Sequence, residues 1–461
     1  MKYCSTRGKV RDLSFREAVM MGLASDGGLL LPEKIPQLSA KQLKALSTLS
    51  YVDLAQEIIS LYATDLPLAD LQQLVQKSYA VFDHPEITPV VRQDGIYILE
   101  LFHGPTLAFK DVALQFLGNL FEYYLDKESK KLNIIGATSG DTGSAAIAGV
   151  RGKKNINIFI LYPHGRVSAV QEMQMTTVAE DNVFNIAIDG TFDDAQAIVK
   201  EIFGDSQFKQ KHALGAINSI NWVRVLAQIV YYFYAYFRVQ ENTGCESVQF
   251  SVPTGNFGDI FAGYMARQMG LPAAPLILAT NANNILSRFV NQGDYSIATV
   301  YHSLSPSMDI QVASNFERYL YFLYEGDTTK LLAAMNRFKS DGNIQFSADS
   351  LDRIQQDFLS AAIDDEQTLE QISSFYHTTG YVLDPHTAVG VAAGNRVGTP
   401  LPLVCLATAH PAKFPEAIAR AIDNADLKTD KIEHLRALQQ HRQRMPADVE
   451  KIKNFIAEKS V

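Results

Sequence analysis

Residues 101–111 read LFHGPTLAFKD, and the remainder of the chain is best interpreted outward from this stretch. A Gly-Pro pair, typical of a turn, precedes Lys110, and apolar residues recur with helical spacing from Val112 to Leu125. The pattern predicts a helix that begins at Lys110. The helix dipole and the apolar surroundings both disfavour a charged ammonium group at that position. An amine that gives up its proton easily suits Schiff-base chemistry, whereas the alternative is an ordinary lysine whose stem lies along the first turn.

The composition is that of a globular protein of two or three domains. The chain has 461 residues, of which 47% are hydrophobic and 20% are charged, and its formal net charge is −9. The negative charge argues against nucleic acid and anionic membrane surfaces as partners. Residues 1–8 lack an apolar signal core, and the most apolar stretch, 225–237, is too short to span a bilayer. Three widely separated cysteines predict free thiols in a reducing compartment, so we expect a cytoplasmic protein.

The order of predicted elements divides the chain into four regions. Residues 1–95 are expected to be mainly helical, with Ser14 as an N-cap and Glu17 as its capping-box partner. Strands and helices then alternate, which predicts an α/β fold with two mostly parallel sheets. We expect a smaller α/β domain at 96–190, a larger one formed by 191–300 and 377–461, and a helical subdomain inserted at 301–376. The last 35 or so residues are predicted to form a polar surface element.

Three predicted loops share one layout, in which a strand precedes the loop and a helix follows it: 137–143, 253–259 and 407–413. Backbone N–H groups at a helix N-terminus bind anions, and in a parallel sheet such loops lie outside the carboxyl ends of the strands. Gly255 and Gly258 would let the second loop approach a phosphate closely, although an ordinary tight turn is the alternative. The first loop offers the hydroxyls of Ser139 and Thr142. Asp141, which only accepts hydrogen bonds, is expected to face away from an anion or to bind an ammonium group, and the alternative is that it caps the next helix.

A fourth candidate region opens the long predicted helix that ends near residue 238. Arg224 lies on its first turn, where a cation is unfavourable unless an anion binds beside it. Asn218 and Ser219 either cap this helix or contact the same anion. Lys413, after the third loop, is likewise a cation near the start of a predicted helix, which a bound anion would explain. His103 and His386 are interpreted as structural residues, and no group of residues has the spacing of a metal site.

In this order along the chain, these stretches resemble the threonine synthase family. Residues 103–111 are similar to its cofactor-lysine motif. The other similar stretches are 3–8, 14–18, 26–29, 139–143, 218–221, 253–259, 308–309 and 408–414. The resemblance implies a fold-type II pyridoxal phosphate enzyme, similar to the tryptophan synthase β chain. It also implies the last step of threonine biosynthesis, the conversion of O-phospho-L-homoserine and water to L-threonine and phosphate.

The resemblance further implies a role for each candidate residue. Lys110 would form the Schiff base with the cofactor and later move protons at Cα and Cβ of the substrate. Thr408 would hydrogen-bond the pyridine nitrogen. The residues expected at the cofactor phosphate are Gly255, Asn256, Phe257, Gly258 and Asp259. The residues expected to bind the substrate are Ser139, Asp141 and Thr142 on its carboxylate side, Asn218, Ser219 and Arg224 at its phosphate, and Lys413.

Two other functions are compatible with the same residues. Another fold-type II enzyme, such as a phosphohomoserine lyase or a hydroxy-amino-acid dehydratase, would share the lysine and the loops. A cofactor-binding protein without activity is a second alternative, but it would not need to keep both Lys110 and residues 255–259. We expect a small-molecule substrate and either a monomer or a homodimer.

Overall fold

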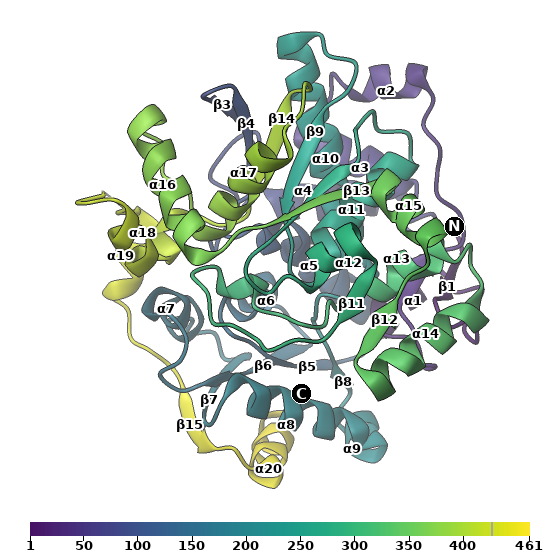
Figure 1. Cartoon of the computed structure of the whole chain (residues 1–461). Helices are drawn as coiled ribbons and strands as arrows, with labels where there is room; N and C mark the ends of the chain where they lie inside the picture. The colour runs from purple at the N-terminus through teal and green to yellow at the C-terminus, as the bar shows by residue number, and fades with distance from the viewer. Residues whose placement is uncertain (426) are drawn as a thin grey trace. The chain divides into compact units, whose positions relative to one another are not determined.

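The computed structural model describes residues 1–425 and 427–461, and the chain forms two compact units. Unit 1 contains Met1–Gln76, Phe82–His103 and Ser219–Ala425. Unit 2 contains Lys77–Val81, Gly104–Asn218 and the segment that follows Ala425. Each unit has a sheet of its own, and helices flank both sheets (Figure 1). The α/β class with two mostly parallel sheets is therefore confirmed.

The main sheet of unit 1 has six strands in the order β13-β10-β9-β14-β4-β3. All neighbouring strands are parallel except the edge pair β3 and β4. Their bounds are β3 Val90–Gln93, β4 Ile96–Glu100, β9 Gln249–Pro253, β10 Leu276–Thr280, β13 Phe358–Ala362 and β14 Leu403–Ala407. Because β4, β14 and β9 are adjacent and parallel, the segments that follow them leave the sheet at the same edge.

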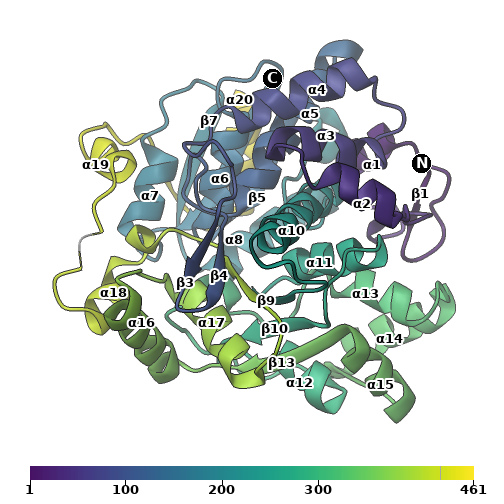
Figure 2. The same ribbon diagram turned by 90° about the horizontal axis from the view of Figure 1, so that it is seen from above.

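Three helices of unit 1 carry or support the candidate residues. Helix α17 (Pro385–Val397) packs on β9, β10 and β14. Helices α10 (Trp222–Thr243) and α11 (Gly258–Gln268) run side by side, as Figure 2 shows. The face of α10 toward the core is almost entirely apolar or aromatic, which explains the long apolar stretch in the sequence.

The N-terminal part of unit 1 combines helices with a two-stranded sheet. Ser14 caps α1 in a complete capping box with Glu17, as predicted. The elements are β1 Tyr3–Ser5, α1 Phe15–Met21, β2 Leu30–Pro32, α2 Ala40–Leu46, α3 Tyr51–Ser60 and α4 Leu68–Tyr79, whose last turn enters unit 2. The later elements of unit 1 are α12 Ile285–Gln292, β11 Asp294–Ser296, η1 Pro306–Met308, α13 Phe316–Leu323, α14 Thr328–Asp341, β12 Asn343–Gln345, α15 Ala348–Asp357, α16 Asp365–Thr379, η2 Pro411–Lys413 and α18 Pro415–Ala421.

The sheet of unit 2 has five strands, all parallel, in the order β15-β7-β6-β5-β8. The strands are β5 Leu132–Ala137, β6 Ile156–Pro163, β7 Val183–Asp189, β8 Leu214–Gly215 and β15 Gln443–Pro446. The helices are α5 Lys110–Glu128, α6 Asp141–Val150, α7 Ala169–Thr176, α8 Phe192–Gly204, α9 Ser206–Lys211, α19 Asp430–Arg436 and α20 Val449–Lys459. The sequence predicts strands at 132–135, 156–162 and 183–188, where β5, β6 and β7 lie. It shows only a short apolar segment at 213–217, where β8 lies, and it does not predict β15, α7 or α9.

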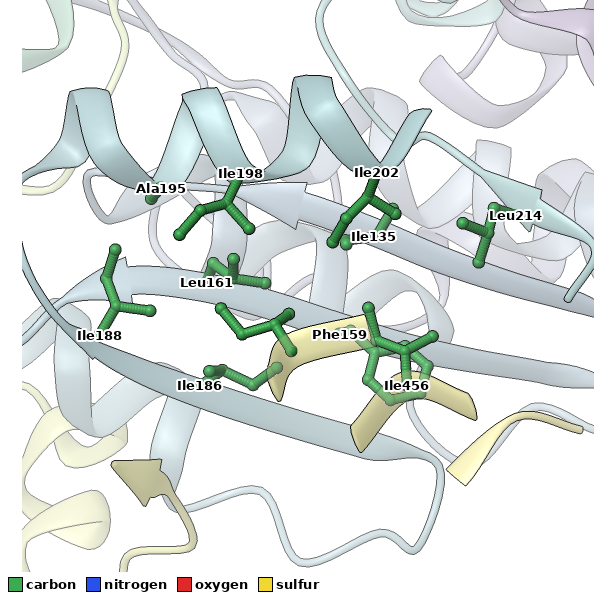
Figure 3. Close-up of a cluster of buried hydrophobic side chains, with 11 residues drawn as sticks. Ile135, Phe159, Leu161, Ile186, Ile188, Ala195, Ile198, Ile202, Leu214 and Ile456 are labelled. Carbon is green, nitrogen blue, oxygen red and sulfur yellow. The ribbon is translucent and has the colours of Figure 1, made fainter. Parts of the chain in front are cut away.

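The C-terminal segment is part of the core of unit 2, so the prediction of a surface element is wrong. Ile452 and Ile456 of α20 belong to one buried cluster with Phe159 of β6 and with Ile198 and Ile202 of α8. Figure 3 shows Ile456 beside Phe159. Strand β15 extends the sheet beside β7. The segment reads as polar because only one narrow stripe of a short helix is buried.

The division into two units differs from the division expected from the sequence. Residues 191–218 and the C-terminal segment belong to unit 2, and residues 301–376 belong to unit 1 together with its N-terminal region. Within 301–376, β13 pairs with β10 in the main sheet, where only helices were expected. Charge-rich helices on both sides obscure this short strand in the sequence.

Two observations concern the expectations that no segment spans a membrane and that the cysteines are free thiols. In the described residues, 1–425 and 427–461, no helix combines the length and the hydropathy that crossing a membrane requires. Cys4, Cys245 and Cys405 are free thiols, as expected.

Candidate active site

Lys110 is the first residue of α5, as the sequence predicts, and a short hydrogen-bonded turn places it there. Both carboxylate oxygens of the fully buried Asp111 accept bonds from Thr106, one from its backbone N–H and one from its hydroxyl, each at 2.7 Å. Gly104 packs against Asp111 so closely that a Cβ at Gly104 would lie 2.4 Å from the Cβ of Asp111. Leu107 adopts a left-handed conformation, with φ 60°. The turn is thus fixed by contacts on both sides of the lysine.

The Lys110 side chain is buried and pairs with Asp141, the first residue of α6. Its Nζ lies 3.2 Å from Asp141 Oδ2. The sequence predicted apolar surroundings for this amine, whereas the structure places a carboxylate beside it. Asp141 therefore contacts an amine, as one of its predicted roles requires. It does not cap the helix, because α6 begins at Asp141 and Gly140 is the N-cap.

Close packing of α5 on α6 holds the backbones that carry Lys110 and Asp141 near each other. A Cβ on Gly118 would lie 2.0 Å from the carbonyl oxygen of Gly149, and a Cβ on Gly149 would lie 2.5 Å from the carbonyl oxygen of Leu114. The two backbones therefore touch, and only glycine fits at these positions. Since Lys110 and Asp141 open these two helices, the glycine contact sets the distance between their backbones.

Helix α7, which the sequence did not reveal, donates hydrogen bonds both to Asp141 and to the turn that precedes Lys110. Gln171 Nε2 donates to Asp141 Oδ1 at 2.8 Å, and Gln174 Nε2 donates to the carbonyl oxygen of Thr106 at 2.9 Å. The two glutamines are three residues apart and so share one helix face. A Ser168 N-cap followed by Gln171 and Gln174 is the signal that could have located this helix.

The 139–143 segment follows β5, but two of its backbone N–H groups already donate hydrogen bonds within the loop. The hydroxyl of Thr138 accepts the N–H groups of Gly140 and Gly143 at 3.0 and 2.9 Å. Ser139 is exposed and Thr142 is half-buried. Both hydroxyls lie within three residues of Asp141 at the carboxyl end of β5, as the sequence predicts.

A double-mutant cycle tests the ion pair in the apoenzyme. We expect Lys110→Met and Asp141→Asn each to lower the free energy of unfolding by about 3 kcal/mol, because each leaves a buried charge without its partner. The double variant is expected to recover most of this loss. Urea unfolding measures all four proteins. The exposed pair Arg353–Glu325 serves as a control, for which the same cycle should give less than about 1 kcal/mol. Additive losses in the Lys110 and Asp141 cycle would contradict the pairing.

In unit 1, residues 254–258 (the 254–258 loop) connect β9 to α11. The loop is backed by a neighbouring segment, because a Cβ on Gly255 would lie 2.8 Å from the carbonyl oxygen of Ser307. Phe257 is the N-cap of α11, with a left-handed φ of 64° and no side-chain hydrogen bond to the helix. An uncapped N-terminus of an eleven-residue helix presents N–H groups to an anion.

Two side chains predicted at the cofactor phosphate point into the protein instead. Phe257 is buried and packs edge-on against Phe316 and Phe358. Asp259 accepts hydrogen bonds from the hydroxyls of Tyr231 and Tyr232, and burial raises the pKa of Asp259 to about 6. These residues could therefore meet a phosphate only through their backbone N–H groups.

The N-terminus of α10 holds Arg224, whose side chain is buried. Its Nε and Nη1 atoms have no hydrogen-bond partner among the described residues. Desolvation lowers the pKa of Arg224 to about 10. The cap of this helix is Asn221, whose side chain accepts the Val223 N–H at 3.1 Å, rather than Asn218 or Ser219 as the sequence allowed. Asn218 is exposed and belongs to unit 2, whereas Ser219 is half-buried and belongs to unit 1.

The segment after β14 contains the other predicted cofactor and substrate residues. Thr408 and Lys413 are both buried, and Lys413 ends the 3-10 turn η2 rather than preceding a helix directly. His410 Nδ1 accepts the Ala412 N–H at 3.2 Å, and desolvation lowers the pKa of His410 to about 4. His410 is therefore neutral at pH 7 and carries its proton on Nε2.

Comparison with known proteins identifies the family. Residues 2–79 match the family described as "Threonine synthase N terminus", residues 387–456 match "Threonine synthase, C-terminal", and residues 81–344 match "Pyridoxal-phosphate dependent enzyme". The threonine synthase of Schizosaccharomyces pombe is 46% identical over 461 aligned residues, which cover 92% of this chain and 90% of that protein. The chain belongs to the threonine synthase family.

Solved structures of this family agree with the fold. The pyridoxal-phosphate-bound threonine synthase of Brucella melitensis superimposes with a TM-score of 0.96 at 42% identity, covering 100% of this chain and 99% of that one. The yeast threonine synthase superimposes with a TM-score of 0.95 at 44% identity, covering 99% and 98%. The predicted family, fold-type II architecture and pyridoxal phosphate dependence are therefore confirmed.

Each unit contains residues that suit one part of this cofactor. In unit 2, Lys110 offers a primary amine for its carbonyl carbon. In unit 1, the 254–258 loop offers an uncapped helix N-terminus for its phosphate. At Gly255 a side chain would meet Ser307, so the backbone itself is left to approach the phosphate. In residues 1–425 and 427–461, no three or more His, Cys, Asp or Glu side chains are grouped so that they could hold a metal ion.

Proposed function

We propose that this chain converts O-phospho-L-homoserine and water to L-threonine and phosphate. The observation that carries the proposal is the buried Arg224 guanidinium, which has two nitrogen atoms without a hydrogen-bond partner in the described part of the chain. A buried cation of this kind is costly unless an anion binds beside it. A substrate that carries a phosphate supplies that anion, whereas a hydroxy-amino acid does not.

The substrate loses a proton at Cβ and phosphate at Cγ, and it then gains a hydroxyl at Cβ and a proton at Cγ. Pyridoxal phosphate, when bound, supplies an electron-accepting ring that stabilises negative charge beside the substrate amino group. In our proposal, Lys110 moves the protons at Cα and Cβ. Asp141 holds the Lys110 amine in place before the reaction, since the two groups are 3.2 Å apart.

The other candidate residues bind and orient the reactants. We assign the cofactor phosphate to the N–H groups of residues 255–259, and the ring nitrogen to the hydroxyl of Thr408. A neutral hydroxyl holds the ring nitrogen unprotonated more readily than a carboxylate would. The hydroxyls of Ser139 and Thr142 bind the substrate carboxylate. The substrate phosphate is assigned to Arg224 and Ser219, with Asn218 and Lys413 as further substrate contacts.

Product analysis tests the proposal. The purified protein is incubated with pyridoxal phosphate and O-phospho-L-homoserine, and phosphate, threonine and 2-oxobutyrate are measured over time. We expect threonine and phosphate in equal amounts. Release of 2-oxobutyrate without threonine would instead identify a phosphohomoserine lyase. Deamination of L-threonine or L-serine, with no reaction of the phosphorylated substrate, would identify a dehydratase.

The cellular location and the oligomeric state remain predictions from the sequence. We propose a cytoplasmic location, in keeping with three free thiols. We also propose a monomer or a homodimer, which sedimentation of the holoenzyme at micromolar concentration would distinguish.

A further inference from the structure

Asn315, which the sequence analysis did not single out, contacts two loops of unit 1 at once. Its backbone N–H and its side-chain Nδ2 both donate to the carbonyl oxygen of Asn256, at 3.0 and 3.1 Å. The same Nδ2 donates to the carbonyl oxygen of Ser219 at 3.2 Å. Asn256 lies in the 254–258 loop, and Ser219 begins residues 219–221, which we call the 219–221 loop. Asn315 is fully buried, so these bonds are shielded from water.

The orientation of the Asn315 amide is fixed by a neighbouring arginine. The guanidinium of Arg318 donates to Asn315 Oδ1, and since arginine only donates, the atom that faces it must be the amide oxygen. The amide nitrogen therefore points to the two carbonyl groups. Arg318 also donates to the carbonyl oxygens of Leu30 and Ile220, the latter at 2.6 Å, so it holds the 219–221 loop as well.

Two further contacts join the same segments. The hydroxyl of Ser314 lies 2.8 Å from the hydroxyl of Ser219 and 3.3 Å from Asn256 Oδ1. A Cβ on Gly258 would lie 3.3 Å from Asn315 Nδ2. Residues 314 and 315 thus touch the 254–258 loop at its middle and at its end, and they touch the 219–221 loop at its start.

The hydrogen bonds to the carbonyl groups of Asn256 and Ile220 also orient the N–H group of the residue that follows each of them. In a trans peptide unit the N–H points away from the C=O. Two donors on the Asn256 carbonyl therefore direct the Phe257 N–H, at the start of α11, away from Asn315. The bond from Arg318 to the Ile220 carbonyl does the same for the Asn221 N–H, just before α10. Both N–H groups lie at the N-terminus of a helix, where backbone N–H groups bind anions.

We propose that Asn315 is a positioning residue that holds the 254–258 loop and the 219–221 loop as one piece, so that the cofactor and substrate phosphates both depend on its amide donors. This inference rests on the proposed function in one respect only, the assignment of the substrate phosphate to Ser219 and Arg224. The cofactor phosphate is a separate anion and can be tested without turnover.

The variant Asn315→Asp removes the amide donor and keeps the oxygen that faces Arg318. Two affinities are measured by titration: that of the apoenzyme for pyridoxal phosphate, and that of the holoenzyme for the phosphonate analogue of O-phospho-L-homoserine, in which a methylene group replaces the ester oxygen. We expect both dissociation constants to rise by about tenfold or more. The thermal midpoint should fall as well, because two buried carbonyl oxygens lose a donor. A merely structural role would lower the thermal midpoint and leave both constants unchanged.

Matched variants separate this effect from others. Asn182→Asp alters another amide whose nitrogen bridges backbone carbonyls, here those of Val150 and Ile156, and it should change neither constant. Asn315→Ala tests whether the new carboxylate merely repels phosphate. If it leaves both constants unchanged, charge repulsion explains the aspartate variant and the proposal is overturned. A change in the pyridoxal phosphate constant alone would also overturn it, because Asn315 would then serve one loop only.

The test also distinguishes this inference from the proposed function. If the wild-type enzyme makes no threonine, the proposed function fails. The pyridoxal phosphate titration nevertheless still reports on the 254–258 loop, and the phosphonate titration on the 219–221 loop. Conversely, normal threonine production with unchanged constants in both Asn315 variants would overturn the positioning role alone.

Discussion

Replacing Lys110 with alanine is expected to abolish threonine formation. The variant loses the amine that reacts with the cofactor and moves protons on the substrate, and proton transfer by a positioned side chain alone contributes about 10²–10⁴-fold to a rate. We therefore expect kcat to fall by more than about 10³-fold, measured as phosphate release. Pyridoxal phosphate should still bind noncovalently, because the residues assigned to its phosphate belong to the 254–258 loop.

Lys153 provides the control for this experiment. It is another largely buried lysine of unit 2, paired with Asn119 and Glu122, and burial lowers its pKa. Lys153→Ala should lower stability but leave kcat within about threefold of the wild type. Borohydride reduction of the wild-type holoenzyme should give a pyridoxyl group on Lys110. Normal turnover by Lys110→Ala, or a reduced adduct on a different lysine, would remove Lys110 from its proposed role.

The elements that the sequence predicted well are those whose signal is local. The capping box at Ser14, the start of α5 at Lys110 and the strands β4, β9, β10 and β14 of unit 1 and β5, β6 and β7 of unit 2 each depend on residues close together in the sequence. Elements with a weak local signal were missed. Strand β13 is five residues long between charged helices, and α20 buries one narrow stripe in a core formed by distant strands.

The same distinction applies to the candidate site. Lys110 and the 254–258 loop are recognisable because the lysine motif and three strand–loop–helix segments occur in one order along the chain, although each alone also fits an ordinary lysine or an ordinary turn. Asn315 was not recognisable, because its partners lie 59 and 96 residues away and an asparagine before a helix is usually a cap. The pairing of Lys110 with Asp141 also depends on the contact of α5 with α6, which glycines at two separate positions permit.

Replacing Arg224 with leucine is expected to have opposite effects on stability and on binding. Burial lowers the pKa of Arg224 from its ordinary value to about 10, a shift that corresponds to roughly 3 kcal/mol of lost stability at neutral pH. The sign follows because the folded state binds this proton less tightly than the unfolded state does, so the loss is complete at any pH below about 10. Arg224→Leu should therefore leave the apoenzyme as stable as the wild type or more stable in urea unfolding.

Binding should change in the other direction. If Arg224 holds the substrate phosphate, the holoenzyme of Arg224→Leu should bind the phosphonate analogue more weakly by about 2–5 kcal/mol, while its affinity for pyridoxal phosphate stays within about threefold. Arg318→Leu is the matched control, because Arg318 is equally buried but donates to Leu30, Ile220 and Asn315. That variant should be strongly destabilised, since three acceptors lose their donor. Equal losses of both affinities in Arg224→Leu would instead assign Arg224 to the cofactor or to the framework, because a residue that serves only the substrate phosphate cannot weaken both.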